Sequence, residues 1–285
     1  MSSAAALNRV QGEASGFDVA VIGGGPAGCS AARLLAAWGY RVAMITRPAP
    51  RPSLAESLPP SARRLLERLD WHHVIDSAGF VRSTGNTFVW EGRDAEAPVA
   101  LRQAFFEQGA LGYQVDRGVL NHVFLQATEQ STVHVIDDAT VIAVHAGVVR
   151  YRRDAGDGDV WARWVLDCSG RSGVVARLGW RRSEPRLRTL AIAGVWERSA
   201  DWPLPDPTHT VVESHPDGWG WSVPVSRTQR HVTVMLDPHL TNISAHGALT
   251  NAYHAELARA PGLHALTRGA ALMAEPFARD ASPYG

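Results

Sequence analysis

Residues 17–47 read FDVAVIGGGPAGCSAARLLAAWGYRVAMITR, and this stretch decides the fold class. Its pattern predicts a strand, a glycine turn, a helix and a second strand. Gly23, Gly25 and Gly28 have the G-x-G-x-x-G spacing. Gly23 permits a tight turn, Gly25 lets backbone approach a pyrophosphate, and Gly28 lets the helix pack closely on the sheet. The stretch therefore predicts an α/β domain that binds a dinucleotide.

The surroundings of the glycine turn support this interpretation. Two apolar, β-rich runs, Asp18–Ile22 and Arg41–Ile45, flank the turn, as the motif requires. The helix that starts at Pro26 and Ala27 would present its N-terminal N–H groups and the positive end of its dipole to phosphates. An ordinary tight turn between strand and helix is the alternative.

The amino-acid composition limits which binding partners and which cellular location we expect. The 28 basic and 28 acidic residues balance, which argues against nucleic acid or an anionic membrane as partner. All of the basic residues are arginine, so lysine chemistry is excluded.

Cys29 and Cys168 match neither metal nor disulfide spacing, and the twelve histidines form no ligand pattern, so no metal site is expected. No apolar run is long enough to span a membrane, and residues 1–16 resemble a flexible tail rather than a signal peptide. We expect a cytoplasmic protein.

The rest of the chain alternates helical and β patterns. Pro48–Pro60 is expected to be a loop, and a helix is expected from Ser61 to about Leu69. Another helix should follow Asp116, and Asp154–Asp159 marks the turn of a hairpin. The segment from Leu190 to Asp237 is rich in strands, and a helix over Thr250–Ala260 should end at Pro261. This order favours a nucleotide-binding domain interleaved with a substrate domain built on an antiparallel sheet.

The second strand does not end in the residue that NAD requires. A carboxylate would bind the ribose 2′-OH there, but Thr46 occupies the place. Arg47 would suit the 2′-phosphate of NADP, or it is simply a solvated loop charge. The glycine turn alone does not separate FAD from NADP.

Three later segments bear on that choice. They are ESLPPS at Glu56–Ser61, YQVDRGVL at Tyr113–Leu120 and VLDCSGRSG at Val165–Gly173. Together with GGGPAG they resemble the FAD-binding segments of the flavin-dependent halogenase and monooxygenase superfamily. The resemblance implies a Rossmann-type FAD-binding domain of the glutathione-reductase and hydroxylase kind, over residues 17–78 and 111–179. Residues 79–110 and 180–285 would form the substrate domain.

The same resemblance assigns further contacts to FAD. Arg117 would reach the cofactor from its helix, and Asp167 to Gly170 would close a strand against the adenine half. Glu56 and Ser57 would face FAD from their loop. Each has a plainer alternative: Arg117 as a surface arginine, Asp167 as a cap of a turn, and Glu56 as a loop acid bonded to backbone. The predicted cofactor contacts are Gly23, Gly25, Pro26, Ala27, Gly28, Thr46, Arg47, Glu56, Ser57, Arg117, Asp167 and Gly170.

A tryptophan pair adds a second signal. Trp219, Trp221 and Pro224 match the W-x-W-x-x-P pattern of flavin-dependent halogenases, in which the tryptophans line the passage between flavin and substrate. Strand alternation places both indoles on one face, about 7 Å apart, and Pro224 should end or edge the strand. An aromatic pair that fills a core between domains is the alternative. Halogenases of this family use a lysine, whereas this chain has none and Arg82 is a poor replacement, so halogenation is not expected.

These observations predict a FAD-dependent oxidoreductase, monooxygenase-like, that acts through an intermediate of reduced flavin and oxygen. Its substrate is a small molecule or a protein side chain, and its electrons come from a flavin reductase or NAD(P)H. The alternatives are a flavoprotein that matures a quinone cofactor in a partner oxidase, a non-catalytic or truncated remnant, and an NADP-dependent reductase. After Ala274 only EPFARDASPYG follows, so the Gly-Asp segment that binds FAD in the family is expected to be missing. No catalytic residue is assigned.

Overall fold

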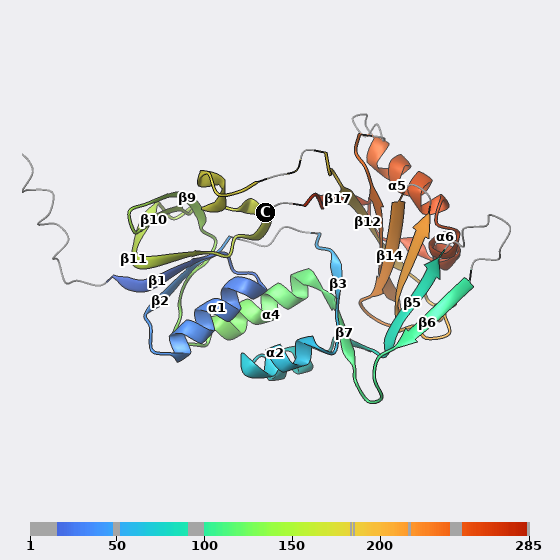
Figure 1. Ribbon diagram of the computed structural model, residues 1–285, viewed down its shortest axis with the longest axis horizontal. Helices are drawn as coiled ribbons and strands as arrows, with labels where there is room; N and C mark the ends of the chain where they lie inside the picture. Colours follow the sequence, from blue (N-terminus) through green and yellow to red (C-terminus); the bar gives the residue numbers. More distant parts are fainter. Residues whose placement is uncertain are drawn as a thin grey trace, which may run out of the picture. The chain divides into compact units, whose positions relative to one another are not determined.

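The chain divides into two compact units in a computed structural model (Figure 1). The structure describes residues 16–47, 52–90, 100–182, 184, 186–215, 218–239 and 247–283. The first unit comprises residues 1–49 and 124–180, and the second comprises residues 50–123 and 181–285. Residues 50–78 and 111–123, which we expected in the FAD-binding domain, thus belong to the second unit by their contacts. The expected division by function stays a prediction.

The first unit contains a six-stranded sheet in the order β8-β2-β1-β11-β10-β9. Strands β8, β2, β1 and β11 are parallel, whereas β10 and β9 continue the sheet as antiparallel strands. Helix α1 packs on β1 and β2 (Figure 1). The elements of this unit are β1 (Phe17–Ile22), α1 (Pro26–Ala37), β2 (Val42–Ile45), β8 (His134–Ile136), β9 (Thr140–His145), β10 (Val148–Arg152), β11 (Gly158–Asp167) and the short 3-10 turns Gly170–Ser172 and Ala176–Leu178. Helix α4 (Arg117–Glu129) spans the boundary between the units.

The second unit is built on a larger sheet in the order β16-β12-β15-β14-β13-β5-β6, with β17 also paired to β12. A separate sheet has the order β3-β7-β4. The elements are β3 (Ala55–Leu58), α2 (Ala62–Arg68), α3 (His72–Ser77), β4 (Val81–Ser83), β5 (Gly85–Trp90), β6 (Ala100–Phe105), β7 (Gly112–Asp116), β12 (Leu190–Glu197), β13 (Thr210–His215), β14 (Gly218–Pro224), β15 (Gln229–Leu236), α5 (Ala248–Ala258), α6 (Pro261–Thr267), β16 (Ala271–Leu272) and β17 (Phe277–Asp280).

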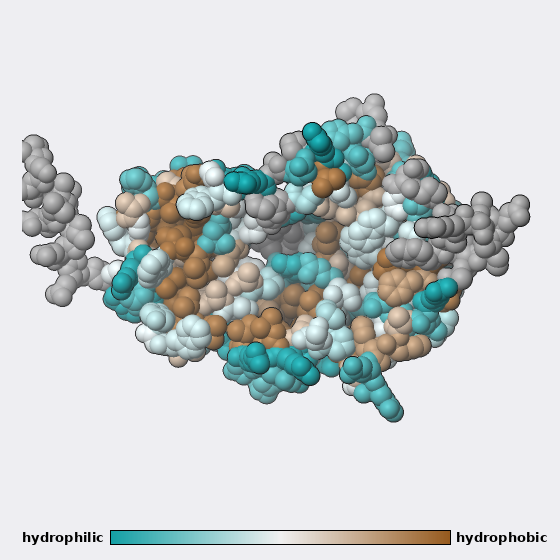
Figure 2. Space-filling view, viewed as in Figure 1, coloured by the Kyte–Doolittle hydropathy of each residue, from teal (hydrophilic) through white to brown (hydrophobic). Residues whose placement is uncertain are grey.

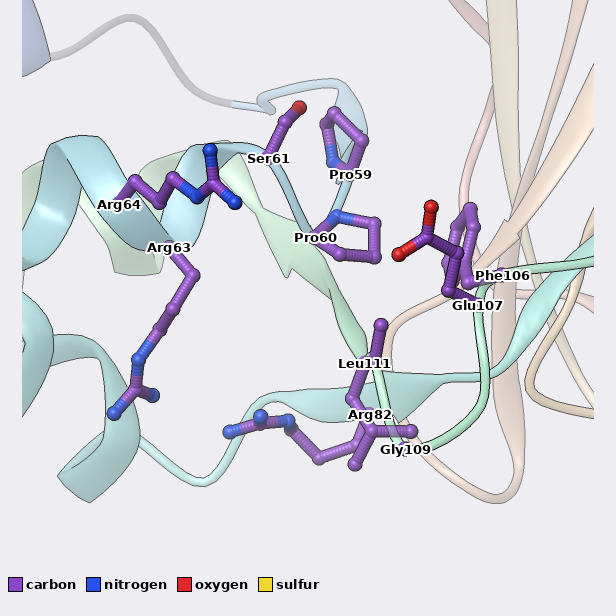
Figure 3. A pocket seen from close by; sticks show the side chains of 11 residues that line it. Pro59, Pro60, Ser61, Arg63, Arg64, Arg82, Phe106, Glu107, Gly109 and Leu111 are labelled. Carbon is purple, nitrogen blue, oxygen red and sulfur yellow. The ribbon is translucent and has the colours of Figure 1, made fainter.

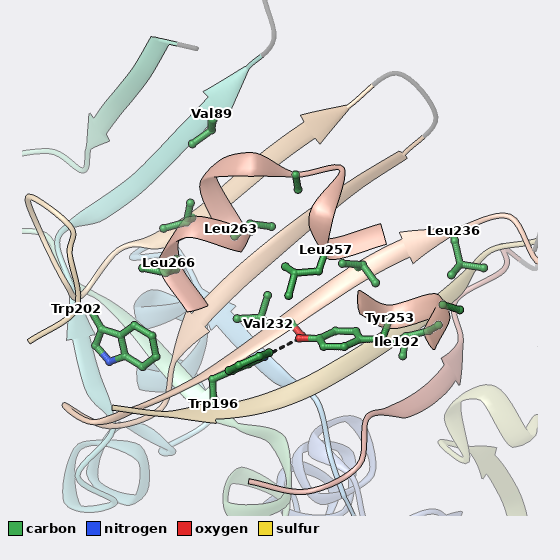
Figure 4. Close-up of a cluster of buried hydrophobic side chains, with 14 residues drawn as sticks. Val89, Ile192, Trp196, Trp202, Val232, Leu236, Tyr253, Leu257, Leu263 and Leu266 are labelled. Atoms are coloured by element: carbon green, nitrogen blue, oxygen red, sulfur yellow. Dashed lines mark hydrogen bonds between the residues drawn. The ribbon is translucent and has the colours of Figure 1, made fainter. Parts of the chain in front are cut away.

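Helices α5 and α6 cover one face of the larger sheet and enclose the core of the second unit (Figure 4). Tyr253 is fully buried there, and its hydroxyl accepts a hydrogen bond from the indole of Trp196 at 2.7 Å. The same hydroxyl donates to the carbonyl oxygen of Val232 at 3.1 Å, so both polar groups of the pair are satisfied. Burial of this apolar face fixes which way each strand residue points.

The sheet of the first unit leaves apolar side chains at the surface. Figure 2 shows brown, apolar surface gathered over this sheet. Trp161, Trp164 and Leu166, all on β11, are among its exposed side chains. None of the helices in the described part of the chain is long and apolar enough to cross a membrane.

Two expectations about the elements are wrong. Residues 55–58 were expected within a loop, but they form β3, because their backbone pairs with β7. The expected helix end at Pro261 is also misplaced: α5 ends at Ala258, and Pro261 starts α6 at a position where proline needs no N–H partner. The first β–α–β unit, the helix after Asp116 and the hairpin at residues 148–167 are confirmed.

Candidate functional site

The glycine turn between β1 and α1 is as tight as its sequence suggests. Gly23 has φ of +113°, a conformation that favours glycine, and its N–H donates to the carbonyl oxygen of Ile45 at 2.8 Å. A Cβ atom on Gly28 would overlap the carbonyl oxygen of Gly23. The turn therefore requires Gly23 for its backbone conformation and Gly28 for close packing of helix and strand.

Gly25 differs from these two glycines, because no contact among the described residues explains a glycine there. Its backbone is extended (φ −81°, ψ 179°), and no described atom lies within 4 Å of the position that a Cβ would take. Helix α1 begins at Pro26 with no side-chain cap and no acidic residue in its first turn. The start of α1 is thus an uncapped, positive helix end beside an open backbone cradle, which fits a diphosphate.

The end of β2 borders this turn. Thr46 is 5% exposed, and its side chain packs so closely on Gly24 that a Cβ there would overlap it. Arg47 donates from Nη2 to the hydroxyl of Ser172 at 2.7 Å. Arg47 therefore joins the end of β2 to the turn that follows β11. Ser172 was not predicted as a site residue, although it lies within the quoted VLDCSGRSG segment.

Asp167 organises that turn after β11. Its Oδ1 accepts from the Ser169 N–H and hydroxyl at 3.1 and 2.5 Å. Its Oδ2 accepts from the N–H groups of Val175 and Ala176 at 2.7 and 3.0 Å. Burial raises the pKa of Asp167, but these hydrogen bonds outweigh burial and hold the pKa below its usual range. The alternative reading of Asp167 as a turn cap matches these contacts. Gly170, next in the turn, has φ of +60°.

Both cysteines near the glycine turn have unreactive surroundings. Burial raises the pKa of the Cys29 thiol to about 11, and burial also raises the pKa of Cys168. A thiol that stays protonated is a poor nucleophile and a poor metal ligand. The raised pKa values favour the interpretation of Cys29, which is buried, and Cys168, which is partly buried, as small packing residues.

In the second unit, two predicted cofactor contacts meet. Glu56 on β3 accepts a short hydrogen bond from Nη1 of Arg117, the first residue of α4. Arg117 also donates from Nε to the Asn121 side chain at 3.1 Å. The pairing of β3 with β7 places Glu56 opposite Val115, two positions before Arg117. Ser57 lies next to Glu56 on β3, opposite Gln114.

The start of α4 is itself held in place. The Asp116 carboxylate accepts from the N–H of Val119 at 2.9 Å, and the Ser53 hydroxyl accepts from the N–H of Gly118 at the same distance. The Ser53 hydroxyl in turn donates to Asp116 at 3.1 Å. The Arg117 side chain is therefore presented from a capped helix end. Sequence reasoning did not single out Ser53, which precedes the quoted ESLPPS segment.

The tryptophan pair lies on β14 as predicted. The rings of Trp219 and Trp221 stack with centroids 4.9 Å apart and planes 29° apart, closer than the expected spacing. Between them Gly220 faces α6, since a Cβ there would overlap the Leu263 side chain at 2.9 Å and the Thr233 carbonyl oxygen at 2.8 Å. The two indoles consequently project from the opposite face of the sheet, and Trp219 is 43% exposed. Pro224 ends β14, which is an interior strand rather than an edge.

Comparison with known proteins identifies the family of the chain. A model of the FAD binding domain matches residues 16–267. The chain belongs to the FAD-binding domain family. Its cofactor is FAD.

Relatives of this FAD-binding domain include flavin-dependent halogenases. Flavin-dependent halogenase armH3 of Armillaria mellea is 27% identical, with 86% of this chain and 54% of that protein covered. Tryptophan 2-halogenase of Chondromyces crocatus is 25% identical over 95% of this chain and 53% of its own length. The myxobacterial chondrochloren halogenase CndH is structurally similar, with a TM-score of 0.84, 26% identity and coverage of 95% of this chain and 65% of the other. The chain spans about half the length of the curated relatives it matches.

These relatives correct one expectation. We did not expect halogenation, because the whole chain contains no lysine and Arg82 is a poor replacement for one. The relatives are themselves halogenases, so that exclusion is not supported. A flavin-dependent, halogenase-like oxidoreductase is the description that the family supports.

The expectation of no metal site stays a prediction. In the part of the chain that the structure describes, Asp70, His72 and His73 bring possible ligand atoms within 4.8 Å of one another. Asp70 and His73 are exposed. The sequence offered only the adjacent pair of histidines as a signal.

Proposed function

We propose that the chain is the FAD-binding part of an oxidoreductase that uses reduced flavin and oxygen on a small-molecule or protein side-chain substrate. The observation that carries the proposal is the uncapped start of α1 beside Gly25, where a Cβ would meet no other described residue within 4 Å, its chain neighbours apart. A phosphate group can approach the backbone there and receive N–H hydrogen bonds. Bound FAD, once reduced, supplies the electrons that activate oxygen.

Residues of the first unit would hold the phosphate and adenine end of FAD. Gly23 and Gly28 keep the turn tight, while Pro26 and Ala27 start the helix whose positive end favours a diphosphate. Arg47 adds a guanidinium at the end of β2, restrained by Ser172. In this proposal Asp167 acts by holding the turn after β11, so that backbone at Gly170 is available to the cofactor.

Residues of the second unit would supply a charged contact. Arg117 is 36% exposed and Glu56 is 39% exposed, so water reaches both members of the pair. A guanidinium on a capped helix start is well placed to pair with an anionic group of the cofactor. Glu56 then restrains the Arg117 side chain, and the neighbouring Ser57 provides a further polar contact. These assignments support FAD binding and assign no proton transfer.

Trp219 and Trp221 would act on the substrate side. Their stacked rings form an apolar, half-exposed surface on the sheet face opposite α6. Such a surface excludes water and can guide an apolar or aromatic substrate. Pro224 ends the strand that carries them. The electron source in this proposal is a flavin reductase or NAD(P)H.

A matched pair of glycine variants tests the cofactor site. Gly25→Ala should lower FAD affinity at least about tenfold, because the new methyl group occupies the cradle, while the melting temperature of the FAD-free protein should fall by only a few degrees, since alanine is a poorer N-cap of α1 than glycine. Gly16→Ala is the control, since a Cβ there makes an ordinary 3.6 Å contact with the Trp161 carbonyl oxygen. Flavin fluorescence titration measures the FAD affinity of both variants. Unchanged FAD affinity in Gly25→Ala would contradict the proposed cradle.

Arg117→Gln provides a second test. Loss of the guanidinium should weaken FAD binding about tenfold, whereas Glu56→Gln leaves the guanidinium in place and should weaken it far less. Because the pair is exposed, both variants should keep stability within about 1 kcal/mol of the parent. Equal FAD affinity in Arg117→Gln and parent would remove Arg117 from the site.

The reaction type requires a turnover assay. The chain is supplied with FAD, a flavin reductase, NADH and an electron-rich aromatic compound, with and without chloride or bromide. Oxygen incorporation without halide identifies a monooxygenase, and halide-dependent products identify a halogenase. Consumption of NADH with neither product, under conditions in which FAD binding is demonstrated, would refute the proposed activity.

A further inference from the structure

The second unit contains a pocket of about 840 Å³ that the proposed FAD chemistry does not use. It lies beside the start of α2, strand β4 and the segment that joins β6 to β7 (Figure 3). Arg63, Arg64 and Arg82 line it, and Glu107 is the one lining residue with a carboxylate. A pocket of this size matches a small organic ligand.

Two of the arginines, both partly exposed, are held by a hydrogen-bond network centred on the partly exposed Asp76. Arg63 donates from Nη1 to Asp76 at 2.8 Å and to the Tyr113 hydroxyl at 2.8 Å. Arg82 donates to the same Asp76 carboxylate at 2.8 Å, and its guanidinium lies 4.1 Å from the centre of the Tyr113 ring. Tyr113 is 1% exposed and donates to Asp76 at 2.6 Å. The two guanidinia are therefore held in place before any ligand arrives.

The network also sets the ionisation of its members. The Tyr113 hydrogen bond is the largest cause that lowers the pKa of Asp76, with Arg63 and Arg82 acting in the same direction against burial. Burial raises the pKa of Tyr113, which therefore stays a hydrogen-bond donor. Asp76 is thus a stable anion that anchors both arginines from behind.

Hydrogen-bond donors remain for a ligand. Arg82 is bonded only through Nη1, which leaves its Nε and Nη2 donors, and Arg63 retains Nη2. Among the described residues, Arg64 has no ion-pair or hydrogen-bond partner and is exposed. Guanidinium groups with unused donors bind carboxylate and phosphate groups in a two-pronged geometry.

The remaining walls are of two kinds. Pro59, Pro60, Phe106 and Leu111 supply apolar surface. In Figure 3 the Glu107 carboxylate projects near Pro60, on the side away from the Arg63 side chain. The pocket thus combines positive charge, an apolar wall and a single acceptor group.

We propose that this pocket binds a small organic acid, with its anionic group on Arg64 and Arg82 and its apolar body against Pro60 and Leu111. A hydroxyl or similar donor at the far end of the ligand would bond to Glu107. The anionic group is a carboxylate or a phosphate monoester, which share the recognition chemistry of arginine. This site goes beyond the proposed function, because none of the twelve predicted FAD contacts lines it, although Pro59, Pro60 and Ser61 belong to the same segment as Glu56 and Ser57.

Calorimetric titration of the FAD-loaded protein tests the proposal. The probes are 4-hydroxybenzoate, its neutral analogue 4-hydroxybenzamide, benzoate, which lacks the hydroxyl, and phenyl phosphate. We expect 4-hydroxybenzoate to bind at least about tenfold more tightly than the amide, since the amide lacks the charge that the arginines recognise. Tighter binding of phenyl phosphate than of 4-hydroxybenzoate would identify phosphate esters as the ligand class, and the reverse would identify carboxylates.

Variants assign the binding to these side chains. Arg64→Gln should lower the affinity for 4-hydroxybenzoate about tenfold. Arg68 is an exposed arginine on the same helix that does not line the pocket, so Arg68→Gln should leave that affinity unchanged. Glu107→Gln should reduce the advantage of 4-hydroxybenzoate over benzoate. FAD affinity should be the same in all three variants.

Several results would overturn the proposal. These are equal binding of acid and amide, no effect of Arg64→Gln, an equal effect of Arg68→Gln, or no binding of either acid at millimolar concentration. Because FAD affinity is measured in parallel, a failure of this pocket is distinguishable from a failure of the FAD site.

Discussion

The turn after β11 depends on the Asp167 carboxylate, and Asp167→Asn tests that dependence. The substitution keeps the size of the side chain but replaces one acceptor oxygen with an NH2 donor. The carboxylate accepts from Ser169 through one oxygen and from the N–H groups of Val175 and Ala176 through the other. The amide of asparagine has only one acceptor oxygen, which can serve either the two Ser169 donors or the N–H groups of Val175 and Ala176. The other pair of donors therefore loses its acceptor.

The size of the effect follows from those bonds. A hydrogen bond to a charged group contributes about 1.5–3 kcal/mol, and partial exposure reduces the cost of breaking two of them to about 2–3 kcal/mol in total. For a protein of this size, that corresponds to a fall of about 4–12 °C in melting temperature. The matched control is Asp159→Asn on the same strand, which breaks an exposed pair with Arg150 and should change stability little.

The pH dependence of the free energy of unfolding gives a second measure of the contribution of Asp167. The pKa of Asp167 is lowered in the folded protein, so its contribution is present above the unfolded pKa of about 3.9 and is lost as pH falls through the folded value. Urea unfolding followed by circular dichroism should show a gap between parent and Asp167→Asn at about pH 7 that shrinks towards about pH 3. A variant as stable as the parent that has nevertheless lost FAD affinity would refute this reasoning, because Asp167 would then act on the cofactor directly.

Three further outcomes are expected. Gly28→Ala should destabilise the FAD-free protein by about 3 kcal/mol or more in urea unfolding, because its Cβ would overlap backbone; a neutral result would contradict the tight turn. The stacked indoles of Trp219 and Trp221 should give an exciton couplet in circular dichroism that either Trp→Phe variant abolishes, and a persistent couplet would exclude the stack. Burial lowers the pKa of His231, so only the unfolded chain takes up its proton as pH falls below about 6.5, and stability should fall with it. His231→Gln should flatten that slope in unfolding measured from about pH 7 to 5, and an unchanged slope would point to other groups.

Local sequence was a reliable guide where short-range geometry decides the structure. The strand, turn and helix at residues 17–37 follow from glycine spacing and apolar periodicity, and both indoles of the β14 pair share a face because side chains alternate along a strand. Residues 55–58 were misjudged because two prolines follow them, whereas their strand pairing comes from β7, more than fifty residues later. No pattern within the segment itself reports such a partner.

The candidate site divides in the same way. The sequence determined the glycine turn, the cofactor class by resemblance, and the absence of lysine, since each depends on residue type and spacing alone. Tertiary structure decided that Glu56 meets Arg117, that the Asp167 carboxylate accepts hydrogen bonds from the turn that follows it, and that Arg63 and Arg82, which line one pocket, both bind Asp76. Those contacts join residues on different elements, so they exist only once the strands have paired and burial has fixed which face each side chain takes.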